Sequence, residues 1–210
     1  MRRWIFLLFS LGLLALVWWL RGNVDQFAFV VPANRDVLYA TTFTDGRFAE
    51  DWSLEERRGY LSGVADDRIQ LTIEEAVILL PSGPDALRVM NRFNYSDFDL
   101  RVQTTALEGP ENNSFGVIFR QVDPATYYIF YISSDGYYSV WRELPTGYIA
   151  MSNWIPTDVI RQGTDGVVND IRVVAQGDTF QFYINGTLMQ VCVPNNPDGV
   201  EFYCMQFDKI

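Results

Sequence analysis

Short apolar runs separated by turn residues follow one another after residue 22, and this pattern constrains the fold more than any other feature. Asp-Gly or Asn-Gly pairs begin at positions 45, 135, 165, 185 and 198. Such pairs favour tight hairpin turns because Asp, Asn and Gly tolerate a positive φ. No long segment in this region has the 3.6-residue apolar period of a helix. The pattern predicts an all-β fold, an antiparallel jelly-roll β-sandwich.

The expected strands are short and often alternate between apolar and polar residues. In the segment 98–104, alternation places Phe98, Leu100 and Val102 on the buried face. Asn185-Gly186 offers a two-residue turn between two further strands. The full set of expected strands is 37–43, 68–73, 76–80, 87–91, 98–104, 115–121, 127–132, 137–142, 168–175, 180–185, 188–193 and 200–207.

The N-terminal segment is apolar on every face. Positions 4–20 carry no charge and would span about 25 Å as a helix at ~1.5 Å per residue, which is enough to cross a bilayer. No small-residue cleavage site follows, so we favour a retained signal-anchor helix over a cleaved signal peptide. Trp4, Trp18 and Trp19 would lie in the membrane interfaces. The expected organisation is a transmembrane helix over 1–22, a tether over 23–37 and a β-sandwich over 38–210.

The distribution of charge indicates both orientation and partners. Arg2 and Arg3 outweigh Arg21, which predicts a single-pass protein of the cell membrane with a cytoplasmic N-terminus and an extracytoplasmic C-terminal domain. The chain has a net charge of -10, and 13 basic residues face 26 acidic ones after the leader. Nucleic acid is therefore excluded as a partner.

Cys192 and Cys204 flank a stretch that contains two prolines and Asp198-Gly199. A turn centred there would bring the two cysteines opposite each other on adjacent strands. We expect a structural disulfide, which suits an extracytoplasmic domain; two buried thiols and a redox pair are the alternatives.

Several segments together resemble the concanavalin A-like lectin/glucanase superfamily, most closely its 3-keto-disaccharide hydrolase-like and laminin-G-like jelly rolls. The resemblance implies a jelly roll in which 42–45 and 206–208 lie on the first and last strands and pair. The segments that carry it are 96–102, 115–120, 127–128, 134–138, 169–173 and 180–188.

Catalytic and metal-binding residues are sparse. The chain has no histidine, which excludes Ser-His-Asp and Cys-His schemes and most zinc sites. Asp97 and Asp99 share a strand face as a glycosidase acid pair would, but solvated charge explains them better. Acidic loops at positions 45, 135, 165 and 198 could hold calcium, although turn formation accounts for each Asp-Gly pair. We expect no cofactor, with calcium as an alternative.

An aromatic face is the best candidate for a ligand-binding site. Its expected members are Arg120, Tyr128, Tyr131, Tyr138 and Trp141. Rings and hydrogen-bonding groups on one face are typical of sugar-binding surfaces. The alternative places most of these rings in the core and makes Arg120 a structural ion-pair residue.

The sequence therefore favours a lectin-like, non-catalytic binding or interaction module held at the membrane. Its partner would be a glycan or a protein, and the chain could serve as an accessory subunit of a membrane complex. The alternative from the resemblance is a glycan or keto-sugar hydrolase.

Overall fold

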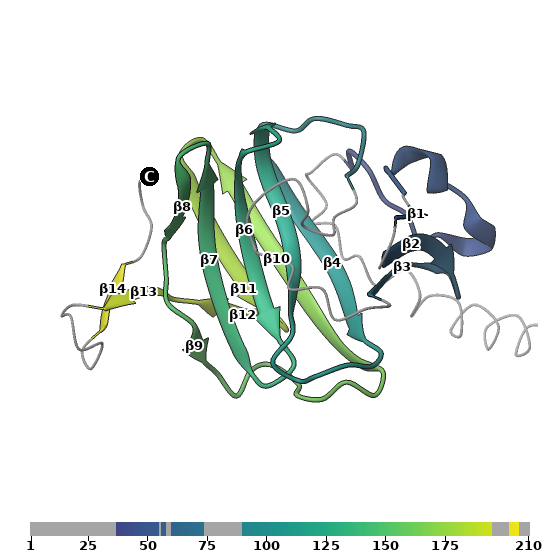
Figure 1. The fold of residues 1–210 in the computed structure, drawn as a ribbon. Coiled ribbons are helices and arrows are strands. Elements are labelled where there is room, and N and C mark those ends of the chain that lie inside the picture. The colour runs from purple at the N-terminus through teal and green to yellow at the C-terminus, as the bar shows by residue number, and fades with distance from the viewer. Residues whose placement is uncertain (1–36, 55, 58–59, 74–89, 195–201, 206–210) are drawn as a thin grey trace, which may run out of the picture.

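A computed structural model describes residues 37–54, 56–57, 60–73, 90–194 and 202–205, with residues 57, 60, 192–194 and 202–205 described by backbone alone. All strand pairs within these residues are antiparallel. Two packed sheets form a β-sandwich (Figure 1), so the expected fold class is confirmed at that level. No helix among the described residues is long and apolar enough to cross a membrane. The expected anchor, with Trp4, Trp18 and Trp19, and the tether up to residue 36 lie outside them.

We call the two layers the front sheet and the back sheet, as Figure 1 shows them. The front sheet contains β5 (Ser114–Asp123), β6 (Thr126–Ser133), β7 (Tyr137–Leu144) and β8 (Gly147–Ala150), with β9 (Ile155–Pro156) also paired to β7. The back sheet has the order β12 (Thr187–Met189), β11 (Thr179–Ile184), β10 (Val167–Gln176) and β4 (Phe98–Ala106).

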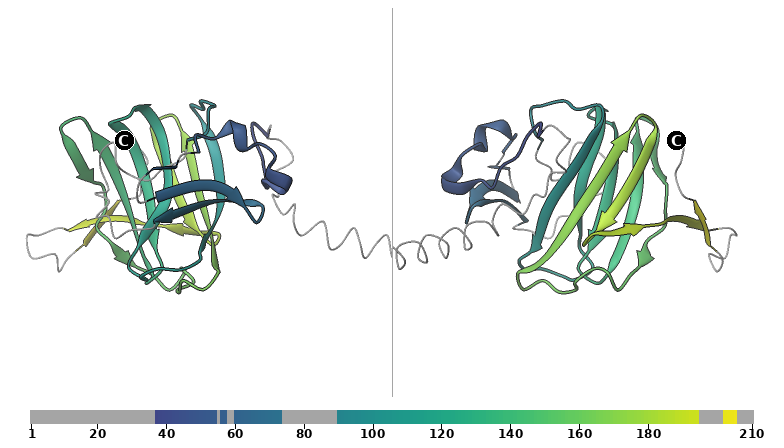
Figure 2. Two further views of the ribbon diagram at one scale, coloured as in Figure 1. Left: turned by 45° about the vertical axis from the view of Figure 1, so that its right-hand side comes forward. Right: turned by 180° about the vertical axis from the view of Figure 1, so that it is seen from behind.

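Smaller elements lie on either side of the sandwich (Figures 1 and 2). On the β4 side are the 3₁₀ turns η2 (Thr44–Gly46) and η3 (Ala49–Asp51) and the sheet of β1 (Glu56–Arg57), β2 (Tyr60–Ala65) and β3 (Arg68–Ile73). On the opposite side is the hairpin of β13 (Val191–Pro194) and β14 (Phe202–Met205).

The core lies between the two sheets and is rich in aromatic rings. Phe130 of the front sheet and Phe182 of the back sheet meet with ring centroids 4.9 Å apart. Phe98, Leu100 and Val102 pack against this core, as alternation predicted. The predicted turn is also confirmed: Asn185 and Gly186 both have positive φ and join Ile184 to its partner Thr187.

The predicted strand over 37–43 is wrong. Residues 37–43 form no strand, and the chain turns at the end of this segment, where Phe43 and then Phe48 adopt left-handed conformations with φ of 56° and 66°. The turns bring the ring of Phe43 to 5.9 Å from Trp52 and that of Phe48 to 6.4 Å from Tyr39. Ring packing therefore outweighs the strand propensity of the β-branched and aromatic residues in this segment.

Other strand predictions differ in detail. The segment 188–193 divides after Met189, since β12 pairs with β11 whereas β13 pairs with β14. Four short strands, β1, β2, β8 and β9, were not predicted. The expected strand 76–80, most of 87–91 and the closing segment 206–208 lie outside the described residues. The cysteine hairpin is confirmed at the backbone level, because Cys192 is paired with Cys204.

Candidate ligand-binding face

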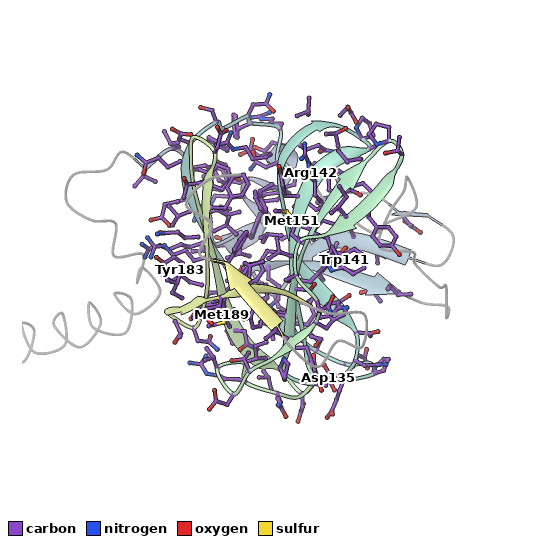
Figure 3. All side chains as sticks on the ribbon, turned by 90° about the vertical axis from the view of Figure 1, so that its left-hand side faces the viewer. Asp135, Trp141, Arg142, Met151, Tyr183 and Met189 are labelled. Carbon is purple, nitrogen blue, oxygen red and sulfur yellow. The ribbon has the colours of Figure 1, made fainter. Side chains whose placement is uncertain are left out.

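The outer face of the front sheet collects the exposed aromatic residues of the sandwich. Strand alternation decides which side chains face outward: Phe130, Tyr138 and Val140 point into the core. Their neighbours therefore point away from it. The outward residues of β6 and β7 include Tyr131, Tyr137, Ser139, Trp141 and Glu143, together with the buried Tyr127 and Ile129. Figure 3 shows Trp141 on this side and Tyr183 on the far side of the back sheet.

A bulge in the edge strand adds a further ring to this face. Ala150 of β8 pairs with Trp141, and Ile155 of β9 pairs with Tyr138. Four residues, 151–154, thus oppose the two residues 139–140 of β7. Bulges of this kind re-aim side chains at a sheet edge. Trp154 lies in this bulge, and its ring centroid is 6.1 Å from that of Tyr131.

Two fully buried serines hold the bulge and an indole in place. The backbone N–H of Val140 donates to Ser152 Oγ at 2.8 Å, and Ser139 Oγ donates to the carbonyl of Ser152 at 3.1 Å. Trp141 Nε1 donates in turn to Ser139 Oγ at 2.6 Å. The indole of Trp141 packs on Tyr148, with ring centroids 4.6 Å apart. The orientation of Trp141 is therefore fixed by hydrogen bonding as well as by packing.

A hollow of about 260 Å³ lies at the end of the face where β6 turns into β7. Its lining includes Tyr137 and Trp154, each 38% exposed. Its polar groups come from Asn112, Ser133 and Asp135. Ser133 Oγ bonds the Asp135 carboxylate and accepts the backbone N–H of Tyr137, which orders the turn. Figure 3 places Asp135 at this end of the sheet.

A buried carboxylate lies toward the other end of the face, and the phenol of Tyr131 lies between it and the hollow. Glu143 is 7% exposed, and burial raises the pKa of its carboxyl group. Burial, together with the charges of Tyr127 and Glu143, raises the pKa of Tyr131 to about 12. The face therefore combines rings at its surface with hydrogen-bonding groups behind them.

The five predicted ligand residues do not form one face. Tyr131 and Trp141 lie together on the outer face of the front sheet. Tyr138 belongs to the core and donates its hydroxyl to the carbonyl of Gln190 at 2.6 Å. Tyr128 faces inward as well and stacks on Phe119, with ring centroids 5.5 Å apart.

Arg120 is held in an irregularity of β5 at a φ of 51°. Its Nη2 atom donates to the carbonyl of Gly177 at 2.8 Å and to Asp97 Oδ1 at 3.2 Å. Its guanidinium also lies 5.7 Å from the ring centroid of Phe180. These contacts connect β5 to the β10–β11 turn. They correspond to the alternative prediction for Arg120, a structural ion pair, rather than to a role in ligand binding.

Asp97 and Asp99 are held by basic and backbone groups. Asp99 receives two hydrogen bonds from Arg172, at 2.6 and 2.7 Å, and also binds Arg101. Asp97 accepts the N–H of Gly177 at 3.0 Å. Burial alone would raise the pKa of Asp99, but the hydrogen bonds and charges of Arg172 and Arg101 hold it below its ordinary value. Such an environment keeps Asp99 ionised and opposes a role as general acid.

Metal ligands do not gather within the described part of the chain, where no group of three or more Cys, Asp or Glu residues could hold an ion. Asp45 has a φ of 56° and takes part in a turn, as its Asp-Gly motif suggested. Asp198 lies outside the described residues.

Sequence reasoning missed Tyr148 and Trp154, which lie in a segment where no strand was predicted. Both are exposed aromatic residues, at 53% and 38%. Their signal was compositional: two large rings lie close to Gly147, Ser152 and Asn153, residue types that favour turns and irregular backbone.

Comparison with known proteins gives little at the sequence level. No protein-family model matches the chain, and no curated protein matches it. Among solved structures, the chain is similar to a carbohydrate binding module, CBM66 from Bacillus subtilis, with a TM-score of 0.48 and 13% sequence identity. The similarity covers 66% of this chain and 76% of that one.

Proposed function

We propose that this protein is a non-catalytic module that binds a glycan through the outer face of its front sheet. The observation that carries the proposal is a polar hollow lined by exposed Tyr137 and Trp154, with exposed Tyr148 packed on Trp141 farther along the same face. The π faces of such rings carry partial negative charge and attract the C–H groups of a sugar ring. Hydroxyl, amide and carboxylate groups beside the rings would bind the sugar hydroxyls.

The face suits an extended ligand. Tyr137 and Trp141 are four residues apart on the same side of β7, which separates them by about 13 Å at ~3.3 Å per residue. The rings are held before any ligand arrives, because the serine pair fixes Trp141 and the bulge fixes Trp154. Preorganised rings lose little conformational entropy on binding.

The cellular setting belongs to the same proposal. The apolar segment 4–20 would anchor the module in the cell membrane, with the sandwich outside the cytoplasm. There it would present the aromatic face to extracellular glycans, alone or as an accessory subunit of a membrane complex. We also propose that the sandwich belongs to the concanavalin A-like superfamily and that Cys192 and Cys204 form a disulfide. The paired backbone register of the two cysteines supports the disulfide.

A glycan hydrolase is less well supported. The one acid pair suggested by the sequence lies on the back sheet, and Asp99 is engaged by Arg172 and Arg101. A retaining or inverting glycosidase needs one acid that can hold a proton near neutral pH, whereas the pKa of Asp99 is lowered.

The proposal is tested with the full chain in mild detergent on a glycan array, followed by calorimetry on the ligands that bind. Trp154→Ala should weaken binding at least tenfold. The matched control is Tyr183→Ala, which removes a ring from the outer face of the back sheet. Binding that both variants retain would reject this face, and a chain that binds no glycan on the array would reject the function.

A further inference from the structure

We infer that the hollow at the β6–β7 turn binds a protonated amine, so that the preferred glycan carries free amino groups. This inference rests on the glycan-binding function proposed above and names its ligand class. The hollow is the one lined by Asn112, Ser133, Asp135, Tyr137 and Trp154.

The charge of the hollow favours a cation. Asp135 is the charged residue among the five that line it. No arginine or lysine within the described residues forms an ion pair with its carboxylate. The hydrogen bond that Ser133 Oγ donates uses one carboxylate oxygen of Asp135, Oδ1. The second oxygen is therefore left for a ligand donor, and a charged donor gives the stronger bond.

The walls of the hollow favour the same ligand. Tyr137 and Trp154 both line the hollow and are both partly exposed, and the ring of Tyr131 extends the aromatic surface next to Trp154. Cations are attracted to the faces of Trp and Tyr rings. Two rings and a carboxylate around one small hollow match an ammonium group better than a neutral amide, which would leave the carboxylate without a counter-charge.

The overall charge of the molecule acts in the same direction. The chain carries 26 acidic and 16 basic residues. This excess attracts amino sugars from a distance and repels anionic ones. Long-range attraction alone does not select a site, so the experiment must separate it from binding in the hollow.

The test measures binding of three short oligosaccharides to the full chain in detergent by calorimetry. They are a β-1,4-linked glucosamine oligomer, its fully N-acetylated counterpart and a β-1,4-linked glucose oligomer. The glucosamine oligomer should bind about tenfold more tightly than either neutral oligomer. Asp135→Asn should remove most of this preference. The substitution keeps a similar shape and an oxygen that accepts the hydrogen bond from Ser133 Oγ, but it removes the negative charge.

The matched control is Asp165→Asn. Like Asp135, Asp165 precedes a glycine; it lies in an exposed bend, and its substitution changes the net charge by the same amount. It should leave the preference for glucosamine intact at both low and moderate salt. A preference that falls equally in both Asp variants, or disappears in the wild type at moderate salt, would show general charge attraction and overturn the inference.

The remaining outcomes distinguish this inference from the proposed function. If the neutral oligomers bind at least as tightly as glucosamine and Trp154→Ala abolishes that binding, the amine site is rejected while the glycan module stands. If none of the three binds but tetramethylammonium shifts the Trp154 indole signal in NMR, the cation site stands and these glycans are rejected as ligands. If neither the oligomers nor tetramethylammonium binds, the inference is overturned.

Discussion

The ion pair between Asp99 and Arg172 offers a sharp test of how the back sheet is stabilised. The pair connects neighbouring strands β4 and β10 through two short hydrogen bonds, and the Arg172 guanidinium also lies 4.8 Å from the ring centroid of Tyr183. Asp99→Asn keeps the size of the side chain but removes its charge. Two guanidinium groups then lose their counter-ion.

The expected loss follows from the exposure of the groups. The Asp99 side chain is 13% exposed, whereas those of Arg172 and Arg101 are 31% and 32% exposed. Breaking a fully buried pair costs about 3–5 kcal/mol, and a surface pair contributes about 0–1 kcal/mol. An intermediate loss of about 2–3 kcal/mol in the free energy of unfolding is expected, or about 5–10 °C in Tm for a chain of this size.

The same pair should make stability depend on pH. Because the pKa of Asp99 is lowered in the folded state, its contribution is present above the ordinary carboxyl pKa and is lost as the pH falls through the folded value. Urea unfolding of the wild type and Asp99→Asn should therefore differ most at neutral pH and converge in acid. A difference below about 0.5 kcal/mol at pH 7, or one that grows in acid, would refute this account.

Three further predictions concern other parts of the sandwich. Gly116→Ala should prevent folding or cost more than about 3 kcal/mol, because the new Cβ would lie 1.9 Å from the carbonyl oxygen of Phe130; near-normal urea unfolding would contradict this. A phenol that titrates near 12 in ultraviolet absorbance should disappear in Tyr131→Phe, and wild-type stability should fall as the pH rises from about 10 toward that value, since the pKa is raised in the folded state. Thiol titration of the denatured, unreduced chain purified from membranes should find no free thiol, as Cys192 and Cys204 lie opposite each other; two free thiols would exclude the disulfide.

The sequence predicted strands of the sandwich well where their side chains alternate regularly or a turn motif separates them. Phe98, Leu100 and Val102 follow the pattern of a half-buried strand, and the Asn185-Gly186 turn specifies its own hairpin. Where rings pack locally, as around Trp52, a run of strand-forming residues over 37–43 does not form a strand. The residue pattern of one short segment cannot show that its rings will pack on a residue outside it, such as Trp52.

The candidate site was only partly predictable for a related reason. Tyr131 and Trp141 were named because they lie on strands, where alternation can be read. Alternation could not show which face of the front sheet becomes core, so Tyr128 and Tyr138, which face inward, were predicted as ligand residues as well. Trp154 depends on a bulge that exists only because β8 and β9 both pair with β7. The pairing of one segment with another cannot be predicted from the residue pattern of either segment alone.

The central claim is that the outer aromatic face binds glycans. The most direct measurement is the affinity of the full chain for an oligosaccharide identified on the array, compared between Trp154→Ala and Tyr183→Ala. The claim predicts at least a tenfold loss in Trp154→Ala, with unchanged Tm, and an affinity within twofold of the wild type in Tyr183→Ala. Equal affinities in the two variants would contradict it.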